Sequence, residues 1–270
     1  GVTMEHIAEQ INNSRKIVIK IGSNVLSTAD GTVDKRIIHS ITEQIHELIK
    51  AGKQVMIVSS GAGIYGVGAI NKWSRRGDIN YKQALCAIGQ VELMMAWKDS
   101  FAVYDKHVAQ MLLTREDFDD PHRTLNIRNA MFTLIDEGVI PVINENDSVS
   151  VDEIKIGDND TLGALTTALW NADLLIILSD IDGVYDKDPK SNEDAELITK
   201  VESIDQLVAS IDTKGKSSFG TGGITTKIEA ARRVNRFGIP MLLLNGTREN
   251  IITDCAGGSG TGTLFVSDVK

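Results

Sequence analysis

The stretch KIVIKIG, residues 16–22, is the first of several short runs of Val, Ile and Leu in this chain. A short apolar run that ends in glycine is typical of a strand buried on both faces of a sheet. The next segment, DKRIIHSITEQIHELIKAG at 34–52, repeats its apolar side chains every three or four positions. That spacing predicts a helix between an Asp34 cap and Gly52. A second buried strand is expected at QVMIVSSG, so the chain begins with a strand, a helix and a strand.

The same alternation continues to the C-terminus and predicts an α/β fold, with a mainly parallel sheet covered by helices. No repeat of fixed period and no low-complexity linker interrupts it. Further strands are expected at HVAQMLLT, VIPVINE, DLLIILSD, IPMLLLNG and TLFVS, and helices around 82–97, 123–137, 159–171 and 223–237.

The length and composition bound the kind of protein. The 270 residues are 42% hydrophobic, which suits one large domain or two small ones. No run of about eighteen apolar residues predicts a membrane helix, and the N-terminus lacks the apolar stretch of a secretory signal. Residues 1–13 are expected to be an N-terminal extension, with Gly1 to Thr3 left over from cloning.

Charge and cysteine content exclude other classes. The net charge of -9 argues against a nucleic-acid surface, which needs a basic face. Cys86 and Cys255 lie far apart and form no C-x-x-C pair, so they are expected to be reduced thiols of a cytoplasmic protein. A small anionic ligand would then need local positive groups.

Two glycine-rich segments match phosphate-binding patterns only in part. GAGIYG at 61–66 fits the dinucleotide fingerprint G-x-G-x-x-G, which also needs a second strand with an acidic end about 20 positions on. Residues 67–82 are polar and not strand-like. GKS at 215–217 looks like the end of a P-loop, but Ser210 stands where the first glycine is required.

A third segment, FGTGGITTKIEAARRV, fits a phosphate site better. Thr221, Gly222 and Gly223 lead into a predicted helix, whose unpaired N–H groups and positive dipole end attract anions. Lys227 lies one turn inside and could reach the same anion. The alternative for this segment alone is a glycine-rich turn with a surface lysine.

Lys20 is the second candidate for that anion. A lysine within a β-branched run is costly to bury, so it either reaches solvent or serves a charged ligand. Gly22 follows closely and leaves the backbone open to a ligand. Lys20, Lys227 and a helix N-terminus together would neutralise a phosphoryl group during transfer.

An acidic stretch, NENDSVSVDEIKIGDND at 144–160, begins where the predicted strand VIPVIN ends. Ligands of open α/β sheets bind at this edge. A run of acids and amides is most often a solvated loop with turn-forming side chains, and that explanation suits Asp152 and Glu153 in its middle.

Six motifs together resemble the glutamate 5-kinases of the amino acid kinase superfamily: KIGSNVL, VSSGA, NENDSV, GDNDTLGA, LSDIDGVYDKDP and TGGITTK, in this order. The resemblance runs from about residue 14 to the C-terminus. NEND with GDND is the distinguishing pair, because related aspartate, N-acetylglutamate, carbamate and uridylate kinases share the frame without it. The resemblance implies one three-layer α/β/α catalytic domain at 14–270, in the short form that lacks a C-terminal domain of RNA-modification-enzyme type.

The resemblance also implies an activity: transfer of the γ-phosphate of ATP to the side-chain carboxylate of L-glutamate, the first step of proline synthesis. Mg²⁺ is expected mainly on the ATP phosphates and water, with no protein ligand assigned. A cytoplasmic homo-oligomer is expected, with possible feedback inhibition by proline.

Site roles follow from the resemblance, position by position. Lys20 and Lys227 would hold the transferring phosphoryl group, and Asp160 would orient both lysines. Tyr65 departs from the small residues common in the family and is expected to alter the entrance of the pocket. The substrate contacts would be Ser60, Gly61, Asp147 and Asn159, and the nucleotide contacts Lys20, Gly22, Ser179, Asp180, Thr221, Gly222, Gly223, Ile224, Thr225, Thr226 and Lys227.

In this reading the two ends of the acidic stretch have separate functions. The ammonium group of a glutamate substrate needs a carboxylate, which Asp147 would supply, and the lysines need Asp160. Two alternatives remain open. One is a nicotinamide-dependent dehydrogenase that uses GAGIYG, and the other is a catalytically silent amino-acid sensor on the same fold.

Overall fold

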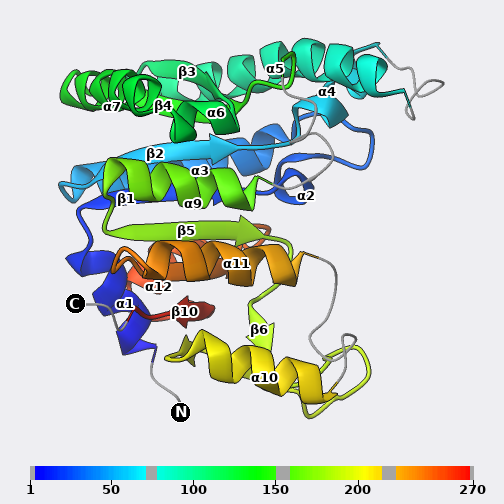
Figure 1. Cartoon of the computed structure of the whole chain (residues 1–270), viewed down its shortest axis with the longest axis vertical. Coiled ribbons are helices and arrows are strands. Elements are labelled where there is room, and N and C mark those ends of the chain that lie inside the picture. The colour runs from blue at the N-terminus through cyan, green and yellow to red at the C-terminus, as the bar shows by residue number, and fades with distance from the viewer. Residues whose placement is uncertain (1–3, 71–77, 150–158, 215–222, 268–270) are drawn as a thin grey trace.

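The computed structural model describes residues 4–70, 78–149, 159–214 and 223–267, and it shows a sheet between two layers of helices (Figure 1). The sheet has eight strands in the order β3-β4-β2-β1-β5-β9-β10-β8. Neighbouring strands are parallel except for β9 and β10. The strands are β1 Lys16–Ile21, β2 Gln54–Ser59, β3 Val108–Leu113, β4 Ile140–Glu145, β5 Leu174–Ser179, β8 Lys200–Val201, β9 Met241–Asn245 and β10 Thr263–Phe265. This α/β/α architecture confirms the predicted fold class.

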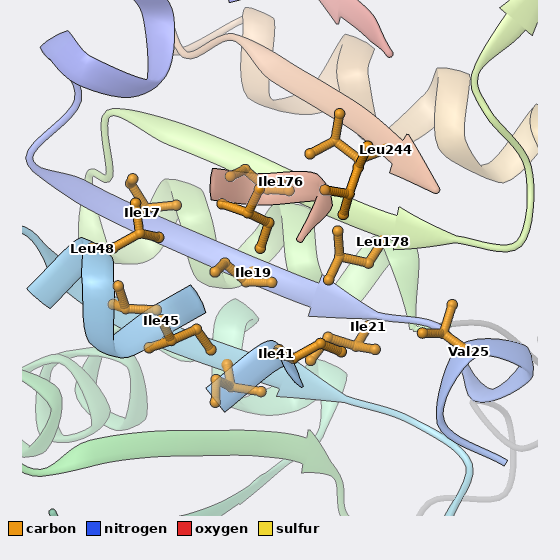
Figure 2. Packing of buried hydrophobic residues seen from close by; sticks show 14 of the residues in the cluster. Ile17, Ile19, Ile21, Val25, Ile41, Ile45, Leu48, Ile176, Leu178 and Leu244 are labelled. Atoms are coloured by element: carbon orange, nitrogen blue, oxygen red, sulfur yellow. The ribbon is translucent and has the colours of Figure 1, made fainter. Parts of the chain in front are cut away.

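One face of the sheet carries α1 Glu5–Asn13, α3 Lys35–Lys50, α5 Ile79–Ala102 and α12 Ile251–Ala256. Figure 2 shows how Ile17, Ile19 and Ile21 of β1 point toward Ile41 and Ile45 of α3. All of these side chains are buried in one apolar cluster. Alternate residues of a strand point to the same face, so the run KIVIKI supplies this cluster with every second side chain.

The opposite face carries α7 Pro121–Asp136, α9 Asp160–Trp170, α10 Ile204–Lys214 and α11 Ile224–Asn235. The other set of strand residues, among them Val18 and Val58, packs against Leu162 and Trp170 of α9. Burial on both faces explains why the central strands read as unbroken apolar runs.

Shorter elements complete the chain. They are α2 Ser23–Leu26, α4 Ala62–Ile70 and α6 Arg115–Asp119, with a separate antiparallel pair, β6 Val184–Tyr185 and β7 Leu197–Ile198. Over the described ranges, no helix is both long enough and apolar enough to cross a bilayer.

The sheet changes its winding direction at β1. From β1 the chain proceeds to β2, then to the edge strand β3 and back to β4 between them, and it then crosses to β5 on the other side of β1. Crossovers that leave a central strand in opposite directions open a crevice at its carboxyl end, which is where ligands of such sheets bind. The topology therefore points to the residues that follow Lys20.

All seven strands predicted from apolar runs are present, the short edge strand β8 was not predicted, and several helix boundaries differ. The helix expected at 82–97 is α5, which extends from Ile79 to Ala102 because the Asp78 side chain accepts hydrogen bonds from the Asn80 and Tyr81 N–H groups. The segment 5–13, treated in the sequence as an extension, forms α1 and buries Ile7 and Ile11 in the core.

GAGIYG, at the start of α4, packs one helix closely on another. A Cβ on Gly66 would collide with the backbone of Leu85 in α5, and a Cβ on Gly89 of α5 would collide with the carbonyl of Ala62. The glycines thus allow α4 and α5 to touch backbone to backbone. The segment lacks the second strand that a dinucleotide site needs, because α5 follows in the next described range.

We expect Gly89→Ala to lower the free energy of unfolding by about 2 kcal/mol, because the new methyl group overpacks the α4–α5 contact. In an unhindered helix the same change would stabilise by up to about 1 kcal/mol, so the sign separates the two effects. Urea denaturation measures it. The control is Gly257→Ala, where φ is -84° and a Cβ would meet only Thr253 O, at 3.4 Å, and Asp254 O, at 3.6 Å. Equal stabilities of the two variants would contradict close α4–α5 packing.

Candidate functional site

A buried cluster of three charged side chains lies beside the carboxyl end of β1. Lys20 Nζ lies 2.8 Å from Asp160 Oδ1, and Lys227 Nζ lies 3.2 Å from Asp160 Oδ2. Lys20 and Asp160 are 0% exposed and Lys227 is 5% exposed. The structure therefore brings together the three residues predicted to act on a phosphoryl group.

Strand alternation and one glycine place Lys20. Its neighbours Ile19 and Ile21 point into the α3 side of the sheet, so Lys20 points to the side covered by α9 and α11. Gly163 of α9 leaves space there, since a Cβ on Gly163 would lie 3.2 Å from Lys20 Cβ and Cγ. Asp160 is the first residue of α9, one turn before Gly163.

The first turn of α11 supplies the third charge. Gly223 precedes this helix with φ of 99°, a conformation that suits glycine. The Thr226 hydroxyl lies 2.8 Å from Asp160 Oδ2 and 2.8 Å from the Gly223 carbonyl, and its one proton can serve either acceptor. Thr226 thereby ties Asp160 to the turn that carries Lys227.

The cluster holds two cations and one anion, so it has a net positive charge in a dry environment. Charges this deeply buried are stable only when paired, and Asp160 is the shared partner of both lysines. Ammonium groups are also good donors to the oxygens of an anionic ligand such as phosphate. Gly22 lies next to the cluster, since a Cβ on it would come 3.8 Å from Lys20 Nζ. Its missing side chain leaves space for a ligand near that ammonium group.

Ser60 and Gly61 follow β2, the neighbour of β1. Ser60 is buried, and its hydroxyl donates to the Ile21 carbonyl over 3.0 Å. Gly61 has φ of 98°, and a Cβ on it would lie 3.2 Å from Tyr65 Oη and 3.1 Å from Ser23 Cβ. Tyr65 is 1% exposed and belongs to the apolar core, and burial raises the pKa of its hydroxyl. The structure thus places Tyr65 in the core against Gly61, and its expected effect on the entrance of the pocket stays a prediction.

Asn159 belongs to a chain of buried amides. Although it precedes α9 at the cap position, its side chain makes no cap. Its Nδ2 instead donates to Asn144 Oδ1 over 2.6 Å, and Asn144 Nδ2 donates to Gln90 Oε1 over 2.8 Å. Asn144 Oδ1 also accepts from the Glu145 N–H at 2.8 Å. This chain joins β4, α9 and α5.

Asp147 follows β4 in a turn that α5 holds. Gln83 Nε2 donates to the backbone carbonyls of Asp147 and Ser148, over 3.3 and 3.4 Å. The Asp147 side chain is a hydrogen-bond partner of the Cys86 thiol. Burial, followed by the charge of Asp147, raises the pKa of that thiol to about 12, so Cys86 stays protonated at neutral pH.

The nucleotide residues are described only in part. Ser179 ends β5 and accepts from the Ile181 N–H over 3.3 Å, and Asp180 accepts from Asn24 Nδ2 over 3.4 Å. Ile224, Thr225, Thr226 and Lys227 form the first turn of α11. Thr221 and Gly222 lie outside the described residues, and so do Gly157 and Asp158 of GDND. The nucleotide role of all these residues stays a prediction.

Sequence reasoning missed two residues that organise this region, Asn144 and Gln90. Asn144 was visible in the acidic stretch but had no assigned partner, and Gln90 lies more than fifty positions away in α5. Polar residues at 83, 86 and 90 recur with helical spacing, which could have indicated a polar stripe on an otherwise mixed helix. Their common target depends on tertiary contacts.

The acidic groups do not gather into a metal cage. Among the described residues, no three or more His, Cys, Asp or Glu side chains are placed to hold a metal ion. The donors present are two lysine ammonium groups, which Asp160 holds, and a helix start, and these fit phosphate oxygens. A divalent cation that arrives with a nucleotide would be held largely by phosphates and water.

Comparison with known proteins places this arrangement in a family. Residues 15–245 match the model described as the amino acid kinase family. The chain is 61% identical to glutamate 5-kinase of Alkaliphilus metalliredigens over 259 residues, which cover 96% of this chain and 98% of that protein. Glutamate 5-kinase of Geobacter sulfurreducens is 45% identical over 256 residues, which cover 95% of this chain and 69% of that protein.

Solved structures share the fold at low sequence identity. UMP kinase from Bacillus anthracis has a TM-score of 0.65 at 18% identity, with 95% of this chain and 97% of that chain covered. Carbamate kinase from Giardia lamblia bound to AMP-PNP has a TM-score of 0.65 at 16% identity, with 95% and 100% covered. These likenesses support the three-layer architecture.

We expect Asp160→Asn to lower the free energy of unfolding of the nucleotide-free protein by about 3 kcal/mol. The substitution keeps the shape of the side chain but removes the carboxylate charge that lies 2.8 Å from Lys20 Nζ and 3.2 Å from Lys227 Nζ. Urea denaturation at neutral pH measures the loss.

The matched control is Asp182→Asn. Arg248 donates to Asp182 over 2.7 and 3.0 Å and lowers the pKa of that carboxyl, but both side chains reach solvent. The contribution of this ion pair to the free energy of unfolding is present at neutral pH and is lost as the pH falls through the lowered pKa of Asp182. We expect Asp182→Asn to lower the free energy of unfolding by less than about 1 kcal/mol. Similar losses in the two variants would contradict the special role of burial at Asp160.

Proposed function

The chain belongs to the amino acid kinase family and, within it, to the glutamate 5-kinases, and from this membership we propose how its buried charges act. The enzyme transfers the γ-phosphoryl group of ATP to the side-chain carboxylate of L-glutamate, the first step of proline biosynthesis. The observation that carries the mechanism is the Lys20–Asp160–Lys227 cluster, because it places two ammonium groups at the carboxyl ends of β1 and β5.

The chemistry needs no general base. The γ-carboxyl of glutamate has an ordinary pKa of about 4.3, so at neutral pH it is already a carboxylate nucleophile. One carboxylate oxygen forms a bond to the γ-phosphorus while the bond from that phosphorus to the leaving ADP oxygen breaks. The products are L-glutamyl 5-phosphate and ADP. Positioning and charge stabilisation are then the main tasks of the protein.

Lys20 and Lys227 perform the charge stabilisation in this proposal. Both ammonium groups would contact oxygens of the transferring phosphoryl group, where negative charge is shared between the incoming and leaving oxygens. Asp160 touches neither substrate. It fixes the two ammonium groups through its two carboxylate oxygens, so little reorganisation is needed at the moment of transfer.

Glutamate would bind between the ends of β2 and β4. The Ser60 and Gly61 segment would face one end of the substrate, and Asp147 would pair with its free ammonium group. Asn159 adds an amide that the Asn144 side chain orients. These assignments rest on the position of the residues at neighbouring strand ends, on the same edge as Lys20.

ATP would lie on the side of β5 and α11. The contacts would come from Gly22, Ser179 and Asp180 and from the helix start at 221–227, whose N–H groups attract phosphate. No protein ligand is assigned to Mg²⁺, which would be held by the nucleotide and water and would supply charge neutralisation there. A buried pair of ammonium groups at that position is compatible with a nucleotide that carries its own cation.

Three further expectations stay predictions. The first is a cytoplasmic location, which fits the use of ATP as phosphoryl donor and the reduced state expected of the cysteines. Proline, the end product of the pathway, would inhibit by feedback. Assembly into a homo-oligomer is checked by light scattering of the purified protein.

ADP release in the presence of L-glutamate, L-aspartate or N-acetyl-L-glutamate tests the proposed function. We expect turnover with L-glutamate alone. Binding of glutamate without ADP release would instead support the silent amino-acid sensor, and turnover with N-acetylglutamate would contradict the substrate assignment.

We expect Lys20→Ala and Lys227→Ala to lower kcat about 100-fold or more, equivalent to about 3 kcal/mol of lost transition-state stabilisation. The glutamate KM should change much less, because the lysines contact the phosphoryl group. The control is Lys187→Ala, which removes an exposed lysine that pairs with Asp194 on the surface. A kcat near that of the control in either variant would contradict the assignment.

We expect Asp147→Ala to raise the glutamate KM strongly and to narrow the discrimination against N-acetylglutamate. An N-acetyl group leaves the Asp147 carboxylate unpaired in a partly desolvated pocket, which is costly. The variant loses both the attraction for the amine and the penalty against the amide. Steady-state kinetics with both substrates measure the ratio of kcat/KM. If that ratio equals the ratio of the unaltered enzyme, Asp147 does not recognise the amine.

A further inference from the structure

One face of α5 contacts the substrate region at three successive positions. Gln83, Cys86 and Gln90 are spaced by three and four residues, so their side chains share one face of the helix. Gln83 donates a hydrogen bond to the backbone after β4, and Cys86 contacts the Asp147 side chain. Gln90 accepts a hydrogen bond from the Asn144 side chain.

The deepest of these contacts is the amide chain that begins at Gln90. Gln90 is 8% exposed, Asn144 is 2% exposed and Asn159 is 6% exposed, so water competes little for their hydrogen bonds. Gln90 Oε1 accepts from Asn144 Nδ2 at 2.8 Å, which fixes the orientation of the Asn144 amide. Asn144 Oδ1 is thereby directed to accept from Asn159 Nδ2 at 2.6 Å.

The amide nitrogen of Gln90 gives a second reason to assign Gln90 a role through Asn144. Gln90 Nε2 is buried, and among the described residues it has no hydrogen-bond partner. An unpaired buried donor is costly, and an apolar side chain of similar size would avoid that cost. The acceptor that Gln90 presents to Asn144 gives a reason for an amide at this position.

The same helix is fixed to the other half of the glutamate region. At Gly89, next to Gln90, the backbone of α5 touches the carbonyl of Ala62, which follows Gly61 directly. At Leu85 it touches Gly66 of α4. Helix α5 therefore contacts both the segment after β2 and the segment after β4.

We propose that α5 is the positioning helix of the glutamate site, and that Gln90 is a positioning residue that sets the affinity for glutamate through Asn144 and Asn159. Gln90 itself contacts no substrate. The proposal rests on the proposed function, since it takes Asn159 as a glutamate contact.

Gln90→Met tests the central contact, because methionine has a similar length and no acceptor of comparable strength. We expect the glutamate KM to rise about 10-fold, as for the loss of one buried hydrogen bond, while the KM for ATP and the kcat change less than about threefold. The kinetics are measured with each substrate varied at saturating concentrations of the other.

Gln44→Met is the matched control. Gln44 is also a buried glutamine, whose Oε1 accepts from the Ile252 N–H at 2.7 Å in the core beside α12. Its loss should lower stability without changing the glutamate KM. An equal rise of the glutamate KM in Gln44→Met would show that any buried amide has this effect and would overturn the proposal.

A double-mutant cycle with Asn159→Ala separates positioning from general loosening. If Gln90 acts through Asn159, Gln90→Met should change the glutamate KM less than about twofold in the Asn159→Ala background. Fully additive effects would overturn the proposal.

Gln83→Ala keeps the test informative even if Gln90→Met does not fold, because Gln83 lies at a half-exposed position. We expect a glutamate KM raised about threefold with an unchanged KM for ATP. An unchanged glutamate KM in this variant overturns the wider role of α5. The unaltered enzyme separates a failure of the proposed function from a failure of the proposed role of α5. Lack of turnover with glutamate in the unaltered enzyme contradicts the proposed function. Normal turnover, with a glutamate KM that the substitutions leave unchanged, contradicts only the role of α5.

Discussion

The buried carboxylate of Asp160, shared by two lysines, is the interaction on which the site depends. A lysine inside a sheet between two helical layers is tolerated only with an anionic partner, and here one partner serves both Lys20 and Lys227. The three charges come from β1, α9 and α11, so the sheet and two helices must meet correctly before the cluster can form. The two ammonium groups that this carboxylate holds in place are the groups proposed to contact the transferring phosphoryl group.

Backbone packing gives this cluster its position. The sheet reverses its winding direction at β1, so the carboxyl ends of β2, β4 and β5 surround the end of the strand that carries Lys20. Glycines provide the close approaches: Gly163 leaves space for the Lys20 stem, and Gly66 and Gly89 let α4 and α5 touch. The segments proposed to bind glutamate follow β2 and β4, and α5 is in contact with both. In the proposed mechanism, α9 and α11 position the phosphoryl-binding groups, and α5 supports the glutamate region over the same sheet edge.

The central strands could be predicted from the sequence because burial on both faces leaves unbroken apolar runs. Lys20 and Lys227 could be proposed as phosphate-binding residues from their local sequence. Asp160 was identified as their partner through motif resemblance, since nothing local to KIVIKIG indicates a partner more than a hundred residues away. The structure revealed two features that neither the apolar runs nor the motif resemblance indicated. Tyr65 is a core residue because its ring packs behind Gly61, and Gln90 matters through Asn144, a contact that requires α5 and β4 to be placed side by side. Helix boundaries shifted where a side-chain cap such as Asp78 extended the helix beyond its apolar pattern.

The central claim is that the buried positive charge acts on the phosphoryl group during its transfer, more than on bound reactants. The direct measurement is the affinity for a transition-state mimic of MgADP, tetrafluoroaluminate and glutamate, compared with the affinity for MgADP alone, in the unaltered enzyme and in Lys20→Met. We expect Lys20→Met to weaken binding of the mimic at least about 100-fold more than binding of MgADP. Equal weakening of both would contradict the account, because Lys20 would then serve only to bind the nucleotide.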